Sequence, residues 1–208
     1  IMLHTSFLLL RKEGACKDRY VFLQKALGPG RGKNTPIPLI TILEHNGLED
    51  AFWALRAVPK EQERERDQLT RLFACRCIQE TPLVSGGMVW DLLRDPRSKR
   101  SLVVAERFLE GLATITEVTA AFRELLKVEE NPAESAVWAA VSAVESAAWG
   151  KNVWAPAAWN AAVLAAKAAA MASESEAVGT MVSKSAAWTM AWENAKQEQE
   201  QIFKRTFG

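Results

Sequence analysis

Few side chains in this sequence are of the types that carry out catalysis or bind metals. The histidines and cysteines are His4, His45, Cys16, Cys75 and Cys77. The histidines are far apart, and neither has metal-ligand spacing to a cysteine or an aspartate. The CxC pair falls in a segment with helical periodicity, so we expect two small core residues rather than nucleophiles. The odd number of cysteines favours reduced thiols, and therefore a cytoplasmic protein, over a disulfide framework.

Two further patterns imitate functional motifs. Asp91 and Asp95 lie one helical turn apart, but nearby arginines would lower the carboxyl pKa values and favour ion pairs over general acid catalysis. The loop at 28–38, GPGRGKNTPIP, resembles a phosphate-binding loop. It has one residue too few before Gly32, and Asn34 follows Lys33 where such a loop requires Ser or Thr. We interpret it as a basic linker, and we expect no catalytic residue, no metal site and no cofactor.

The elements that position these side chains are predicted to be helices throughout. No stretch shows sustained alternation of apolar and polar residues, so we expect an all-α protein, a compact bundle of about ten helices. Helix-start signals support this, because Asp95 precedes Pro96 and Thr114 precedes Glu117 by three residues. A first helix is expected over 2–13.

The C-terminal third, 132–203, is an alanine-rich tract that we divide into helices near 132–149, 156–178 and 180–203, with breaks at 150–152 and at Gly179. Alanine is the best helix former, and its small side chain lets helices approach closely. Large indole rings recur in this tract: Trp138, Trp149, Trp154, Trp159, Trp188 and Trp192. We expect most of them to be buried between the helices, with one or two exposed.

Composition excludes several classes of protein. The 208 residues are 49% hydrophobic and 25% charged, with a formal net charge of +1. Disorder, general nucleic-acid binding and a strongly acidic DNA mimic are therefore disfavoured. The apolar segment 153–172 is interrupted by Pro156, Asn160 and Lys167, so a membrane span is not expected. The mixed-charge run EQERERDQ at 61–68 is interpreted as a solvated surface.

Three blocks resemble a known family: ILEHNGLEDAFWALR at 42–56, RLFACRC at 71–77 and SKRSLVVAERFLEGLAT at 98–114. Followed by an Ala/Trp helix, they are similar to the ordered blocks of the type-five immunity protein family of bacteria and phages. The resemblance covers about residue 40 to the end and implies a small cytoplasmic protein that neutralises a target by binding it. The first segment resembles a separate helical module of phage-type proteins. We therefore expect two domains, 1–35 as a helical hairpin with its linker and 36–208 as the immunity-type domain.

The residues expected to bind lie in or beside these blocks: Trp53, Arg56, Arg71 and Arg107. Arginine beside an aromatic ring can hold a carboxylate or a phosphate. A structural alternative is that Trp53 belongs to the core and that Arg71 pairs with a neighbouring acid.

We expect a non-enzymatic inhibitor of the immunity type, whose partner is a toxin or a defence effector. Two other functions stay open. One is a phage-encoded anti-defence protein that sequesters a nucleotide signal, and the other is a structural subunit that forms homo-oligomers through the Ala/Trp helices.

Overall fold

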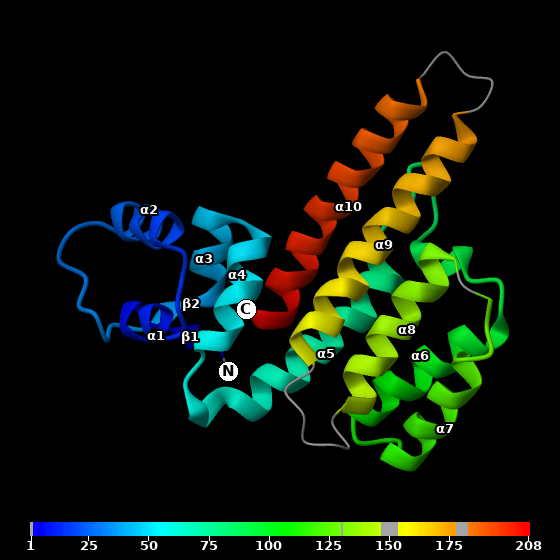
Figure 1. Ribbon diagram of the computed structural model, residues 1–208, viewed down its shortest axis with the longest axis horizontal. Coiled ribbons are helices and arrows are strands. Elements are labelled where there is room, and N and C mark those ends of the chain that lie inside the picture. Colours follow the sequence, from blue (N-terminus) through cyan, green and yellow to red (C-terminus); the bar gives the residue numbers. More distant parts are fainter. Residues whose placement is uncertain (1, 130, 147–153, 178–182) are drawn as a thin grey trace. The chain divides into compact units, whose positions relative to one another are not determined.

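The computed structural model describes residues 2–129, 131–146, 154–177 and 183–208, and the prediction of an all-α fold is confirmed for these residues (Figure 1). The chain divides into two compact units, unit 1 with Ile1–Leu69 and Phe203–Gly208, and unit 2 with Thr70–Ile202. The sequence-based boundary at residue 35 therefore lies inside unit 1. The ten helices of the described residues are α1 Phe7–Lys12, α2 Lys17–Leu27, α3 Leu39–Asn46, α4 Leu48–Ala54, α5 Glu63–Glu80, α6 Pro96–Leu109, α7 Ile115–Leu125, α8 Pro132–Glu145, α9 Trp154–Glu176 and α10 Lys184–Phe207.

The start of the chain is a short strand rather than a helix. Strand β1 (His4–Thr5) pairs antiparallel with β2 (Ile37–Pro38), with Thr5 opposite Ile37. Helix α1 begins only after Ser6, whose hydroxyl accepts a hydrogen bond from the Leu9 amide at 3.3 Å. The predicted helix over 2–13 is therefore too long at its start, because the pairing with β2 extends the first residues. The same pairing ties the N-terminal hairpin to the segment that enters α3.

The linker between α2 and β2 does not have the order of elements that a phosphate loop needs. A phosphate loop connects a strand to a following helix. Here helix α2 comes first and strand β2 follows. Within the loop, the Arg31 guanidinium donates to the Pro36 carbonyl oxygen at 2.7 Å. The interpretation as a basic linker agrees with this order of elements.

Helices α3 and α4 form the part of unit 1 that carries two of the predicted binding residues. Gly47 separates them with a φ of 87°, a left-handed conformation that side-chain-bearing residues rarely adopt. Helix α4 ends at Ala54 and continues as a 3-10 turn, Leu55–Ala57, before Pro59. This 3-10 turn holds the first strand in place, because the Thr5 hydroxyl donates to the Ala57 carbonyl oxygen at 2.6 Å.

Two helix starts in unit 2 follow the sequence prediction. The Asp95 carboxylate accepts a hydrogen bond from the Arg97 amide at 2.8 Å, with Pro96 as the first residue of α6. Thr114 and Glu117 form a reciprocal capping box at the start of α7. Both signals are local, so the sequence alone is enough to place them.

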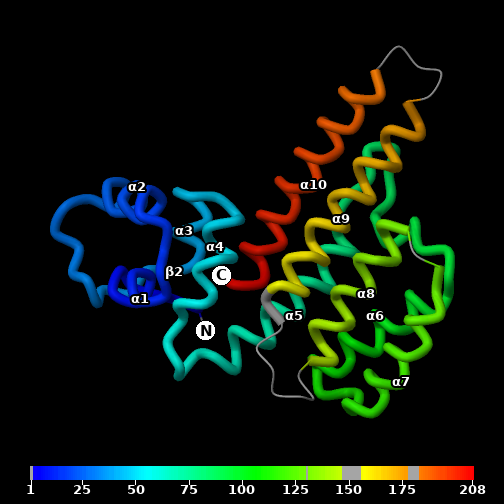
Figure 2. The backbone as a smooth tube through the Cα atoms, in the orientation of Figure 1, coloured from blue at the N-terminus to red at the C-terminus, as the bar shows by residue number. Residues whose placement is uncertain are grey.

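The alanine-rich helices pack through alanine rather than through tryptophan. Helices α8 and α9 run side by side (Figure 2). Trp138 is 44% exposed, and Trp159, Trp188 and Trp192 are only half-buried. One exposed ring, Trp138, agrees with the expectation of one or two, but none of these four rings is fully buried, because helices close enough to bury alanine leave no room for an indole between them. The alanines of α9 that are at most 4% exposed are Ala158, Ala161, Ala162, Ala165, Ala166, Ala168, Ala169 and Ala170.

Some predictions fall on residues outside the described ranges. Trp149 and the breaks at 150–152 and Gly179 are among them, as is the side chain of Trp154. The described helices of the tract start and end within a few residues of those expected. Among the described residues, no helix is long and apolar enough to cross a membrane.

The mixed-charge run differs from expectation at one position. Arg66 is only 5% exposed, and its guanidinium pairs with the Asp67 carboxylate at 2.7 Å. The other charged residues of the run are exposed or half-buried. The prediction of a solvated surface is therefore correct for most of the run. It is wrong for Arg66, because the position of this residue in α5 turns its side chain inward.

Candidate functional site

Trp53 and Arg56, two of the four predicted binding residues, lie together in unit 1. Trp53 is half-buried near the end of α4, and Arg56 follows it in the 3-10 turn and is exposed. The Arg56 guanidinium carbon lies 5.7 Å from the centre of the Trp53 ring. This distance is that of a cation–π pair. The pair presents an aromatic ring and a positive charge on the same surface.

Arg71 and Arg107, the other two predicted binding residues, belong to unit 2, where each donates to a backbone carbonyl. Arg71 Nε binds the carbonyl oxygen of Ala143 in α8 at 2.9 Å, and Arg107 Nη2 binds that of Leu112, just after α6, at 3.2 Å. Arg71 is half-buried and Arg107 is exposed. The two guanidinium groups hold different segments of backbone, so unit 2 does not bring them together on one ligand.

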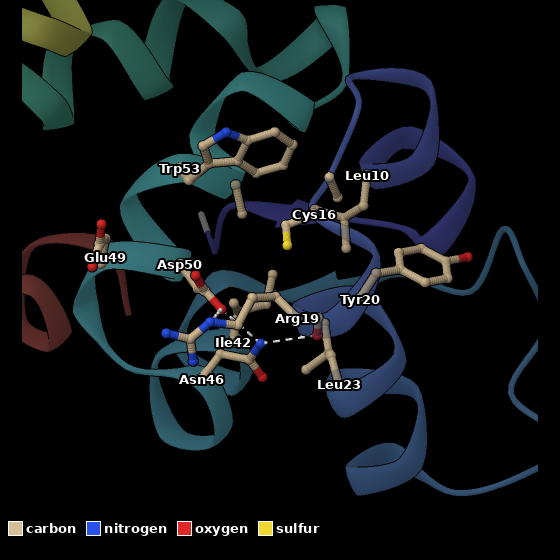
Figure 3. A pocket seen from close by; sticks show the side chains of 12 residues that line it. Leu10, Cys16, Arg19, Tyr20, Leu23, Ile42, Asn46, Glu49, Asp50 and Trp53 are labelled. Atoms are coloured by element: carbon tan, nitrogen blue, oxygen red, sulfur yellow. Dashed lines mark hydrogen bonds and ion pairs between the residues drawn. The ribbon is translucent and has the colours of Figure 1, made fainter.

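A small pocket, which we name the Cys16 pocket, opens beside Trp53 in unit 1 (Figure 3). Its volume is about 130 Å³. Apolar side chains make most of its lining, and the charged or amide groups are confined to Arg19, Asn46, Glu49 and Asp50. The lining residues come from α1, the short connection after it, α2, α3 and α4: Leu10, Ala15, Cys16, Arg19, Tyr20, Leu23, Ile42, Asn46, Glu49, Asp50, Trp53 and Ala54.

Asn46 organises the polar side of the Cys16 pocket. Its Nδ2 donates to Asp50 Oδ2 at 2.8 Å and to the Arg19 carbonyl oxygen at 3.2 Å, so it links α3 to both α4 and α2. Arg19 Nε lies 3.7 Å from Asp50 Oδ2, and the Arg19 side chain is 57% exposed. An ion pair this exposed contributes little stability. Its consequence is instead that the one cationic side chain of the pocket lining lies beside a carboxylate.

Trp53 is the one lining residue that the sequence indicated as a binding residue; Cys16 and Tyr20 are among those it did not. Cys16 is exposed and precedes α2 directly, and Figure 3 shows its side chain among those that line the pocket. The Tyr20 ring packs edge-on against Phe7, with the ring centres 5.4 Å apart. The only signal for this arrangement is the segment GAC between two short helices, which brings α2 back along α1.

The other two thiols have no comparable access to solvent. Cys75 and Cys77 are fully buried in α5. Burial raises the pKa of both thiols well above the ordinary value, and the charges of Glu106 near Cys75 and Glu80 near Cys77 act in the same direction. Both are therefore neutral small residues of the core, as expected from the sequence.

The described residues offer a surface for binding rather than a metal centre. Among them, no group of three or more His, Cys, Asp or Glu residues is placed to hold a metal ion. The Cys16 pocket combines an apolar floor, an aromatic edge and a few paired polar groups. Such a lining suits the burial of one apolar or aromatic group with a polar end.

Comparisons with protein-family models, with curated proteins and with solved structures found no match. The resemblance to immunity proteins in the blocks at 42–56, 71–77 and 98–114 therefore stays a prediction. The geometry of the Cys16 pocket and of the Trp53–Arg56 pair is independent of it.

Proposed function

We propose that this chain is a non-enzymatic binding protein of the immunity type, which neutralises a protein partner such as a toxin or a defence effector. The Cys16 pocket and the Trp53–Arg56 pair would form the centre of the contact surface. Interfaces of this kind draw most of their affinity from a few aromatic and arginine residues around a pocket that takes an anchor side chain.

The observation that carries the proposal is the size and lining of the Cys16 pocket. At about 130 Å³, it is below the roughly 300 Å³ at which pockets for drug-sized ligands begin. A single side chain of a partner can enter such a space, whereas a whole nucleotide cannot. The apolar floor favours a hydrophobic anchor, and Asn46 and Asp50 lie at the edge where its backbone would bond.

The alternative, sequestration of a nucleotide signal, has one observation in its favour. Trp53 and Arg56 are the residue types that stack on a base and hold a phosphate. However, the Arg56 guanidinium lies over the ring that a base would need. The pocket beside it is also lined by the Glu49 carboxylate, which repels phosphate, and its one arginine, Arg19, already pairs with Asp50. A partner protein fits this combination of groups better.

Native mass spectrometry on the chain purified from a host that expresses its genomic neighbours distinguishes these functions. A partner protein at fixed stoichiometry, lost in Arg56→Ala, is the expected result. Lys99→Ala is the matched control, because Lys99 lies over Trp90 in unit 2 with its Nζ 5.4 Å from the ring centre. A bound mass of a few hundred daltons with nucleobase absorbance would overturn the proposal. An oligomer of this chain alone would favour the structural subunit.

A further inference from the structure

We propose that unit 2 carries a second binding site, centred on Glu134, for the ammonium or guanidinium group of a lysine or arginine side chain in a peptide or protein. We name it the Glu134 site. It lies in a different unit from the Cys16 pocket, and it does not depend on the function proposed above.

The Glu134 carboxylate is buried but only partly bonded. Glu134 is the third residue of α8 and is 3% exposed. Its Oε1 accepts hydrogen bonds from the backbone amides of Arg94 at 3.1 Å and of Asp95 at 3.3 Å. Its Oε2 is also buried, and within the described part of the chain this atom has no hydrogen-bond partner. A buried polar atom without a hydrogen bond costs free energy, so a donor that reaches this oxygen would be bound favourably.

Glu134 lines two cavities, so a side chain that enters either of them comes close to this residue. One, of about 380 Å³, is lined by Arg94, Glu129 and Asn131 as well as by Glu134. The other, of about 50 Å³, lies between Glu134 and Trp138. The smaller cavity has room for the end of one side chain. A buried carboxylate whose residue lines two cavities can meet a cation that enters from outside, which a fully enclosed one cannot.

The charges around Glu134 favour a cation. Asp95 also lines the larger cavity, but the Arg97 guanidinium neutralises it at 2.7 Å. Among the described residues that line this cavity, two other carboxylates, Glu129 and Glu134, remain, and Arg94 carries the one positive charge. The described residues hold no cluster of three His, Cys, Asp or Glu for a metal ion. An oxygen that lacks a hydrogen-bond donor is matched by an organic cation, whose N–H groups donate to a carboxylate.

Trp138 supplies the second half of the site. It follows Glu134 by four residues, so both side chains lie on the same face of α8. The ring packs against Phe122 with centres 5.9 Å apart and is still 44% exposed. A cation within about 6 Å of an indole is attracted to its face. Leu125 and Leu126 line the same small cavity, and they can pack against the methylene stem of the incoming side chain.

The test is a titration of the whole chain with the peptide acetyl-Gly-Arg-Gly-amide, followed by the indole N–H signals in nitrogen-15 spectra. The same peptide with citrulline in place of arginine is the uncharged isostere. We expect the arginine peptide to shift the Trp138 signal, which Trp138→Phe assigns by its loss, and we expect the citrulline peptide to bind at least about tenfold more weakly.

Two variants locate the binding. Glu134→Gln keeps the oxygen that accepts from Arg94 and Asp95 but removes the charge, and it should weaken binding of the arginine peptide about tenfold. Glu110→Gln, at the other end of α6 from Asp95, is the control and should bind like the parent. If Glu134→Gln folds poorly, Trp138→Leu should weaken binding several-fold at an exposed position.

Three results would overturn the proposal: equal binding of both peptides, binding unchanged in Glu134→Gln and Trp138→Leu, or no Trp138 shift at millimolar peptide. Tighter binding of free spermidine than of the arginine peptide would also overturn it, since the site would then serve a free polyamine rather than a side chain.

Discussion

Gln199 of α10 donates its Nε2 amide to the carbonyl oxygen of Ala162 in α9 at 2.7 Å. Gln199 is 3% exposed, so this bond is inside the helix pair rather than on its surface. Towards the other end of the same two helices, the Ser173 hydroxyl donates to the Ala187 carbonyl oxygen at 3.3 Å. The two bonds connect residues that rise in number on one helix as they fall on the other. They therefore fix the antiparallel register of α9 and α10.

Replacing Gln199 with alanine should destabilise the protein. The substitution removes a buried hydrogen bond and leaves a gap, for which we expect a loss of about 1–2 kcal/mol in the free energy of unfolding. Urea unfolding followed by circular dichroism measures it. Gln197→Ala is the matched control, because Gln197 is exposed two residues earlier. Equal stability of the two variants would show that the Gln199 bond does not hold the helices together.

The helices could be predicted because their signals are local. The caps at Asp95 and Thr114 depend on a few neighbouring residues, and the structure has them where the sequence placed them. Gln199 could not be distinguished from its neighbours in this way, since it lies in the polar run KQEQEQ at 196–201. Which glutamine is buried depends on how α10 meets α9, and that is a property of the tertiary structure.

The candidate sites also differ in how far local sequence predicts them. Trp53 and Arg56 are three residues apart, so their spacing alone predicts that the side chains can meet. The Cys16 pocket requires α2 to pack near α3 and α4, and no local pattern specifies that. Glu134 would be read from sequence as an ordinary acid in the first turn of a helix. Its burial comes from the backbone of Arg94 and Asp95, about forty residues earlier.

The alanine packing of α9 predicts sensitivity to larger side chains. Ala165 is fully buried, so Ala165→Leu would force apart helices that are in close contact. We expect a loss of about 1–3 kcal/mol, the usual range for overpacking a dense core. Lys167→Leu introduces the same side chain at an exposed position of α9 and is the control. The comparison uses the midpoints of urea unfolding, and a core with room to spare would tolerate both substitutions equally.

Asp95 should make stability depend on pH in the acid range. The side-chain hydrogen bonds from Arg97, followed by the Arg97 amide, lower the pKa of the Asp95 carboxyl below its ordinary value. A lowered folded-state pKa means that the stabilisation is present above the pKa of the unfolded chain, about 3.9, and is lost as pH falls through the folded-state value. Asp95→Asn keeps a residue that caps helices well but removes the charge.

We therefore expect Asp95→Asn to be less stable than the parent at pH 7. The difference should shrink as the pH falls below about 4 and disappear once the parent carboxyl is protonated in both states. Thermal unfolding of the two proteins over this pH range measures it. A difference that persists undiminished in acid would mean that the amide disturbs the start of α6 rather than removing an ion pair.

Cys16 should be the one thiol that reacts in the folded protein. It is exposed at the Cys16 pocket, whereas Cys75 and Cys77 are fully buried and have raised pKa values, so they present neither access nor thiolate. Treatment with N-ethylmaleimide should add one adduct to the native chain and three in denaturant, as read by mass spectrometry. The folded Cys16→Ser variant should then carry no adduct. More than one adduct on the folded parent protein would contradict the burial of Cys75 and Cys77 in α5.

Labelling also reports on the pocket itself. The maleimide group is attached at the lining of a space of about 130 Å³, so it should obstruct entry of an anchor side chain. If the proposed partner protein uses this pocket, it should slow the labelling of Cys16, and labelled protein should bind the partner at least about tenfold more weakly, as expected for the loss of a central anchor. Cys16→Ser treated with maleimide should keep its affinity, because the pocket then stays open. A partner that binds labelled and unlabelled protein equally must use another surface.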